Sequence, residues 1–284
     1  SGGVLADERT VVLATDRLFG LRAFDPYDRV ATFGAGTRGA DAEAAVAERG
    51  FTLGHRPTSI DRSSVGGWVA TRSAGELSTG YGNIEDLVYS LEAVLPDGTV
   101  FRSRQTPRAA AGPDLRQLLI GSEGTLGIVT EVGFSLREPP EQSLRRAFHF
   151  EHFAAGIEAL RAVMGPGWRP HLVRLLDARE SSRHFRDGCP SGRSVLLLLH
   201  EGPAPRAEVE AAAVREICRA HGGQALPAEL VDAWFGHEEP AQSWRQLFEE
   251  GLVTDTIEVA TGWSRLVPLY EAVGTALQAE TSLV

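Results

Sequence analysis

Residues 121–130 read GSEGTLGIVT and place three glycines directly before a run of β-branched residues. Residues 63–75 read SSVGGWVATRSAG and combine three further glycines with several hydroxyl side chains. Small residues let the backbone approach a ligand closely, and N–H and hydroxyl groups suit a pyrophosphate. Residues 63–75 are equally consistent with a Gly/Ser-rich loop that binds no ligand. Residues 121–130 fit either a bulged hairpin entry or backbone packed against a flat cofactor. The two stretches together are far more specific than either alone.

A second glycine pattern, GAGTRG at residues 34–39, matches the spacing of a dinucleotide-binding fingerprint. It follows a predicted strand and precedes a predicted helix, as such a fingerprint requires. The acidic residue expected about 20 positions later is absent, because residues 53–56 read LGHR. The pattern therefore favours a tight turn from strand to helix over a Rossmann site.

Length and charge exclude several classes of protein. The 284 residues predict about two domains. Subtracting 38 acidic from 28 basic residues gives −10, which disfavours nucleic acid and anionic membrane surfaces as partners. The chain has no lysine, so Schiff-base chemistry and a P-loop lysine are excluded. No apolar run reaches the ~18 residues of a membrane span.

The cysteines and histidines indicate neither a disulfide framework nor a metal site. Cys189 and Cys218 are too few for a zinc cage, and Cys218 falls in an amphipathic helical stretch that predicts a buried thiol. The eight histidines are scattered without metal-ligand spacing, so no metal is expected. The N-terminal residues do not resemble a signal peptide, and a reduced, cytoplasmic compartment is expected.

The chain divides near Pro139 into a β-rich part, residues 1–140, and a part of alternating helices and strands, residues 141–284. In the first part we expect strands at 10–15, 29–33, 87–95, 100–104 and 128–136, a helix at 40–49 and a helix or turn at 114–119. In the second part we expect strands at 148–150, 172–176, 195–200 and 257–259, and helices at 153–164, 206–220 and 265–279. The order β-α-β-β-α-β predicts an α+β fold with a ferredoxin-like layer.

Five stretches now carry a resemblance: HRPTS at 55–59, VGGWVATR at 65–72, YGNIEDL at 81–87, AGPDL at 111–115 and GSEGTLGIVT at 121–130. Together they closely resemble the PCMH-type, vanillyl-alcohol-oxidase flavoprotein family, and most of all its alkylglycerone-phosphate synthase branch. VRLLD at 173–177 and WSR at 263–265 fit that branch too. The resemblance implies FAD as cofactor, held by a PCMH-type FAD-binding domain over residues 1–140. A cap or substrate domain follows over residues 141–284.

The resemblance also implies site residues. Arg174 matches an arginine needed for activity, and Arg265 one that binds the substrate phosphate. The alternatives without a function in catalysis are an ion pair at a domain interface for Arg174 and a solvated charge for Arg265. The segments expected to contact FAD comprise Pro57, Thr58, Ser59, Ile60, Asp61, Arg62, Ser63, Ser64, Gly66, Gly67, Thr71, Arg72, Ser73, Ala74, Gly75, Glu123, Gly124, Thr125, Leu126, Gly127, Ile128 and Val129. If FAD lies against Gly66 and Gly67, neither position tolerates a side chain.

Three functions stay open. The first is the exchange of an acyl for an alkyl group on a dihydroxyacetone-phosphate ester through a flavin N5 adduct. The second is an FAD-dependent dehydrogenase or oxidase of a 2-hydroxy acid or another alcohol. The third is a non-catalytic binding or scaffold protein, suggested because the family's PGGGTS loop and late histidine cluster lie outside residues 1–284. A small-molecule or lipid-like substrate and a homodimer are expected by resemblance.

Overall fold

The computed structural model describes residues 7–186, 188–236, 249–251 and 257–280. The chain divides into two compact units, Ser1–Pro139 and Pro140–Val284. Each unit has its own sheet and its own core. The mixture of helices and antiparallel sheets confirms the predicted α+β class.

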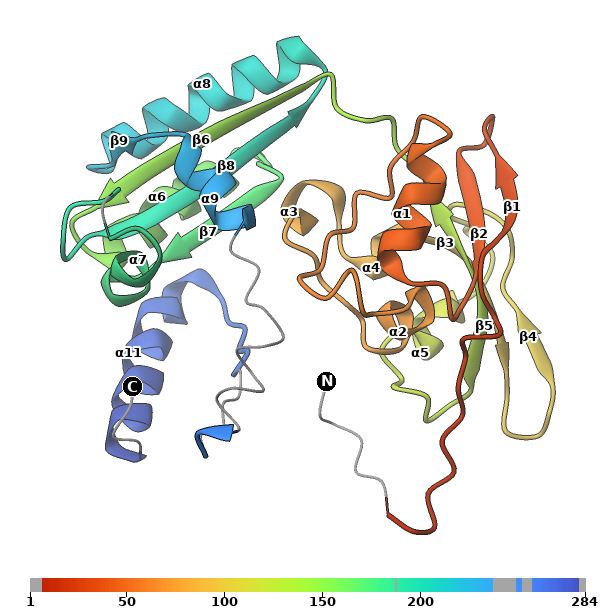
Figure 1. The fold of residues 1–284 in the computed structure, drawn as a ribbon. Coiled ribbons are helices and arrows are strands. Elements are labelled where there is room, and N and C mark those ends of the chain that lie inside the picture. Colours follow the sequence, from red (N-terminus) through yellow and green to blue (C-terminus); the bar gives the residue numbers. More distant parts are fainter. Residues whose placement is uncertain (1–6, 187, 237–248, 252–256, 281–284) are drawn as a thin grey trace. The chain divides into compact units, whose positions relative to one another are not determined.

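The first unit is built on a five-stranded antiparallel sheet in the order β1-β2-β5-β3-β4 (Figure 1). The central strand β5 pairs with β2 on one side and β3 on the other. The strands are β1 (Leu21–Asp25), β2 (Val30–Gly34), β3 (Val88–Val94), β4 (Val100–Arg102) and β5 (Ile128–Ser135). The turn at Pro96 to Thr99 joins β3 to β4, as its sequence predicts.

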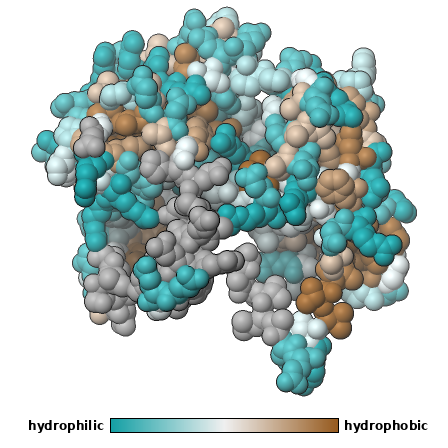
Figure 2. Space-filling view, in the orientation of Figure 1, coloured by the Kyte–Doolittle hydropathy of each residue, from teal (hydrophilic) through white to brown (hydrophobic). Residues whose placement is uncertain are grey.

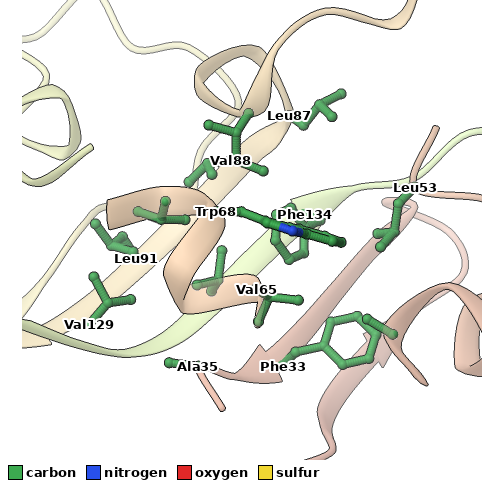
Figure 3. Packing of buried hydrophobic residues seen from close by; sticks show 14 of the residues in the cluster. Phe33, Ala35, Leu53, Val65, Trp68, Leu87, Val88, Leu91, Val129 and Phe134 are labelled. Carbon is green, nitrogen blue, oxygen red and sulfur yellow. The ribbon is translucent and has the colours of Figure 1, made fainter. Parts of the chain in front are cut away.

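Helices and loops cover one face of this sheet. The helices are α1 (Gly39–Ala47), α2 (Val65–Ala70), α3 (Ser78–Tyr81), α4 (Ile84–Leu87) and α5 (Arg116–Leu119). Trp68 on α2 is 1% exposed and packs with its ring edge-on to Phe134 of β5, with Phe33 of β2 nearby (Figure 3). Large aromatic side chains bury much apolar surface, so Trp68 is the main anchor of α2 on the sheet.

The glycines of residues 34–39 are explained by close packing within the chain. A Cβ on Gly34 or Gly36 would collide with the carbonyl oxygens of Leu18 and Thr15, and one on Gly39 with the Trp68 ring. The buried hydroxyl of Thr37 closes the turn, since it donates to the Gly34 carbonyl (2.7 Å) and accepts from the Gly20 N–H. The segment is thus a tight turn from β2 into α1, as the sequence favours.

The second unit has a four-stranded antiparallel sheet in the order β7-β8-β6-β9, with connectivity β-α-β-β-α-β (Figure 1). This confirms the ferredoxin-like prediction. Its elements are β6 (Gln142–Phe150), α6 (Phe153–Met164), β7 (Leu172–Leu176), α7 (Ala178–His184), β8 (Ser194–Gly202), α8 (Ala204–Ala220), β9 (Gln224–Leu226), α9 (Glu229–Gly236) and α11 (Trp263–Glu280).

The core of the second unit lies between this sheet and α6 and α8. Phe148 and Phe150 of β6 pack with Leu196 and Leu198 of β8 and with Cys218 of α8. The prediction of a buried Cys218 thiol is confirmed, and burial raises its pKa to about 12. The remaining leucines of β8 are buried as well, because α7 and α9 contact that strand.

Two predicted strands are wrong. Residues 10–15 pair with no strand in the described part of the chain, and Val11, Val12 and Leu13 are 62–90% exposed. They form a brown patch in Figure 2, at the place of the red N-terminal segment of Figure 1. Residues 257–259 are also irregular. In both cases the β-prone composition has no neighbouring strand to complete its hydrogen bonds, and β9 supplies the fourth strand of the sheet instead.

Candidate functional site

Segments far apart in the sequence form one surface of the first unit. The N–H groups of Gly121 and Glu123 donate to the carbonyls of Val69 and Ala70, each at 2.9 Å. These bonds join the start of the stretch 121–130 to the last turn of α2. Further back, the Ala35 N–H donates to the Thr130 carbonyl at 2.9 Å. The structure therefore brings together the stretches that the sequence singles out as cofactor contacts.

The loop of residues 57–64 is held by hydrogen bonds to the start of α1 and to α2. The N–H of Gly39 donates to the Ser63 carbonyl, and that of Ala40 to the Ile60 carbonyl. The Ser63 hydroxyl accepts from Trp68 Nε1 at 2.7 Å, and Ser64 caps α2 by accepting from the Gly67 N–H. These two hydroxyls are engaged in the fold, whereas the exposed residues of this loop are Thr58, Ser59, Asp61 and Arg62.

Within residues 63–75, Val65–Ala70 is the helix α2, so this stretch is not the plain Gly/Ser-rich loop that was the alternative to a ligand-contacting segment. Gly66 is buried, and a Cβ there would lie 2.7 Å from the Ala35 Cβ. At Gly67 the nearest atom to a Cβ is Ser64 Oγ, at 3.2 Å. The need for glycine at position 66 therefore comes from packing of α2 on β2, and position 67 has more room.

Two residues other than glycine have left-handed backbone conformations on this surface. Arg72 has φ of 52° and Glu123 has φ of 50°. Such conformations cost roughly 1–3 kcal/mol each, and they concentrate at binding and active sites. Both residues are exposed, and the hydrogen bonds between 69–70 and 121–123 hold their backbones in place. The strain marks the junction of the two segments as a candidate site.

Polar and apolar groups alternate around this junction. The Arg72 guanidinium lies 3.8 Å from a Glu85 carboxylate oxygen and 3.4 Å from Gln117 Oε1. Leu126 and Ile128 are large apolar side chains that are 47% and 41% exposed. A guanidinium and the exposed hydroxyls of residues 58 and 59, with exposed apolar side chains further along residues 121–130, are residue types that suit a dinucleotide carrying phosphates and flat rings. The residues present therefore fit FAD.

His55 lies beneath the surface and was not predicted as a site residue. It is 3% exposed, its Nε2 lies 3.2 Å from Ser73 Oγ, and its ring meets the Trp68 ring edge-on at 4.7 Å. Nδ1 is buried without a hydrogen-bond partner among the described residues. Burial lowers the pKa of His55 to about 4, so the ring is neutral at pH 7.

A cavity of about 670 Å³ opens beside Arg72, lined by β3, β4, α5 and the loop 103–115. The sequence does not predict this cavity. The loop has no periodic pattern; AGPDL at 111–115 indicates the family but not a cavity, and the spacing of Arg102, Arg104 and Arg108 is the other signal. Glu85 and Gln117, the neighbours of Arg72, also line the cavity.

In the second unit, Arg174 and Arg265 have different environments. Arg174 is on β7, half-buried, with its guanidinium carbon 5.3 Å from the centre of the Trp234 ring of α9. Its Nε is buried without a hydrogen-bond partner in the described residues. Trp234 also meets the His184 ring edge-on at 5.1 Å. Arg265 is exposed in the first turn of α11. Arg174 is thus the more firmly held of the two.

Comparisons with known proteins identify the FAD-binding domain and the fold. Residues 1–104 match the FAD binding domain family. An uncharacterized FAD-linked oxidoreductase, YgcU of Escherichia coli K12, is 37% identical over 280 residues, which cover 96% of this chain and 58% of YgcU. The alkyldihydroxyacetonephosphate synthase of Caenorhabditis elegans is 43% identical over 143 residues, which cover 50% of this chain and 24% of the synthase.

A solved structure of an alkyldihydroxyacetonephosphate synthase superposes with a TM-score of 0.80 at 24% identity, covering 93% of this chain and 52% of that one. This confirms the PCMH-type fold. YgcU and the solved synthase match almost all of this chain, and the chain spans about half of the length of each. No helix in the described part of the chain has both the length and the apolar character needed to cross a membrane. Residues 1–104 are thus an FAD-binding domain with FAD as cofactor, and the chain as a whole is similar to FAD-linked oxidoreductases and, in part, to alkyldihydroxyacetonephosphate synthases.

Proposed function

We propose that this chain is the FAD-binding and substrate-contacting part of an FAD-dependent oxidoreductase acting on a small hydroxylated substrate. The observation that carries the proposal is the hydrogen-bonded junction of residues 69–72 with 121–123, where two residues other than glycine are held at positive φ. The relative that matches almost the whole chain is an FAD-linked oxidoreductase, which supports redox chemistry. Bound FAD would supply the electron transfer.

The proposal gives each segment of the first unit a role. The exposed loop residues Thr58 to Arg62 and the Arg72 guanidinium would hold the diphosphate, since a guanidinium fork matches phosphate oxygens. The backbone from Glu123 to Val129, with the exposed Leu126 and Ile128, would contact the adenosine part. In the second unit, which we propose to be the cap or substrate domain, Arg174 and Arg265 would orient an anionic group of the substrate.

Titration of the purified, flavin-depleted protein with FAD, followed by the quenching of flavin fluorescence, tests the cofactor site. We expect Arg72→Gln to weaken FAD binding about tenfold or more, because a charge-assisted hydrogen bond contributes roughly 1.5–3 kcal/mol. Arg22→Gln is the matched control, since Arg22 is an exposed arginine on the edge strand β1. Equal FAD affinity in wild type and Arg72→Gln would refute this assignment.

A second candidate reaction is the synthase exchange of an acyl for an alkyl group on a dihydroxyacetone-phosphate ester. The specific observation in its favour is the match of both units to an alkyldihydroxyacetonephosphate synthase. Anaerobic mixing of the FAD-loaded protein with D-lactate, glycolate and other alcohols separates the two reactions. Loss of the oxidised flavin absorbance supports the oxidoreductase. Flavin that stays oxidised, together with exchange on an acyl-dihydroxyacetone-phosphate ester, supports the synthase.

A further inference from the structure

The cavity beside Arg72 contains acidic and basic side chains, and the acidic ones are already engaged. Asp114 accepts hydrogen bonds from the Arg116 guanidinium at 2.8–3.1 Å. Asp86 accepts from the Asn83 N–H at 3.1 Å. Glu85 Oε1 lies 3.8 Å from the Arg72 guanidinium, and Glu85 Oε2 is buried without a hydrogen-bond partner among the described residues. Arg116 and Arg72 therefore offset the charges of Asp114 and Glu85, whereas Asp86 is bonded to a neutral N–H and keeps its charge.

Two of the basic residues are also engaged. Arg116 is only 12% exposed, and besides Asp114 it donates to the carbonyls of Val88 and Tyr89. Arg102 pairs with Glu92 at 2.7 Å. Both guanidinium groups therefore serve the fold of β3, β4 and α5. Their charges are already balanced by carboxylates of this chain.

Arg104 and Arg108 differ from these two. Neither forms an ion pair with the described residues, although both line the cavity. Arg104 donates to the Ala111 carbonyl at 2.9 Å, which ties the two ends of the loop together and leaves its other N–H groups for a ligand. The hydroxyl residues Ser103 and Thr106 line the same cavity. Arg104 and Arg108 carry two charges without an ion-pair partner in the described residues, against one such carboxylate, Asp86, in the lining, and this excess of positive charge favours an anion.

We propose that this cavity is an anion-binding subsite in which Arg104 and Arg108 hold a phosphate or carboxylate group. Guanidinium groups bind both anions through paired N–H donors. The anion has two possible sources, the diphosphate of FAD and an acidic group of the substrate, because the cavity borders Arg72. The assignment of a source rests on the proposed function, whereas the anion site itself does not.

Calorimetric titration of the purified, flavin-depleted protein with inorganic phosphate at low ionic strength tests the site. We expect the variant Arg104→Gln/Arg108→Gln to bind phosphate at least about tenfold more weakly than wild type, given the usual strength of charge-assisted hydrogen bonds. The matched control is Arg102→Gln, which removes a charge from the same cavity wall where Glu92 already balances it. Its affinity for phosphate is expected to stay within about twofold of wild type.

Thermal melting checks that both variants are folded, and three results overturn the proposal. The first would be a wild type that binds no phosphate. The second would be a double variant that binds phosphate as tightly as wild type. The third would be an Arg102→Gln variant whose phosphate binding is weakened as much as that of the double variant. The same titration with FAD-loaded protein identifies the source. Phosphate binding that FAD abolishes assigns the subsite to the cofactor diphosphate. Phosphate binding that persists beside FAD assigns it to an acidic substrate. Failure of FAD to bind leaves the first titration valid, so the two proposals fail separately.

Discussion

Replacing His55 by glutamine is expected to make the first unit less sensitive to acid. The ring is buried against Trp68 and neutral, and its pKa is lowered from 6.5 to about 4. In the unfolded chain the same ring takes up a proton near pH 6.5, so acid favours unfolding. The stability that depends on neutral His55 is therefore complete above pH 6.5 and is lost as the pH falls toward 4.

The magnitude follows from the difference between the two pKa values. At about 1.4 kcal/mol per pH unit, the full effect of His55 is about 3 kcal/mol at pH 4. Between pH 7.5 and 5.0, where most carboxylates remain ionised, the free energy of unfolding should fall by about 2 kcal/mol because of this residue. His55→Gln should abolish that part of the pH dependence, whatever it costs in packing.

Urea unfolding at the two pH values, with the transition of each unit fitted separately, measures the difference. His152→Gln is the control, since His152 is an exposed histidine of the second unit. NMR titration of the histidine rings provides a direct check, with the His55 signal assigned by its loss in the variant. A His55 ring that titrates near pH 6.5, or equal pH dependence in wild type and His55→Gln, would show that the burial argument is wrong.

Three further predictions concern packing and positioning. Gly66→Ala should lower the free energy of unfolding by about 1–3 kcal/mol because its Cβ overlaps Ala35, whereas Gly67→Ala should change it by less than about 1 kcal/mol; urea unfolding tests both. Trp234→Ala should raise the KM for an anionic substrate about 3- to 10-fold, because it releases the Arg174 guanidinium, and Trp234→Phe should restore the KM. Steady-state kinetics in which only kcat changed would contradict this. Glu210→Ala should cost about 3 kcal/mol, visible as a lower Tm, since it leaves the buried His200 ring without its carboxylate.

The elements that the sequence predicts best are amphipathic and sharply bounded. Helix α6 and strand β7 have the predicted residues, because the apolar positions of α6 follow the helical period, β7 is a short apolar run, and the segment between them contains Gly165, Gly167 and Pro170. Strand β1 was missed, since LRAFD carries two charges and alternates weakly. Strand β9 has three residues and no hydrophobic alternation, so the sequence predicts the fourth strand at the β-prone residues 257–259 instead. Pairing partners decided these cases, and a local pattern does not specify them.

The candidate site follows a similar rule. Glycine and hydroxyl motifs indicated segments that the structure does bring together, and their contacts with FAD stay a prediction. The conformations of Arg72 and Glu123 depend on hydrogen bonds between α2 and residues 121–123, which no local window reveals. The cavity was missed for a related reason. Whether an arginine is free to bind an anion depends on partners such as Glu92 for Arg102, which lie on another strand.

The hydrogen bonds that unite the cofactor surface also set when it can form during synthesis. Gly121 bonds to Val69 across about fifty residues, and Ala35 bonds to Thr130 across nearly twice that separation. Contacts of such long range form late, because the intervening chain must first be ordered. A nascent chain therefore cannot complete this surface until β5 has left the ribosome. Because β5 is also the central strand of the sheet, the sheet and the candidate cofactor surface are completed in the same step.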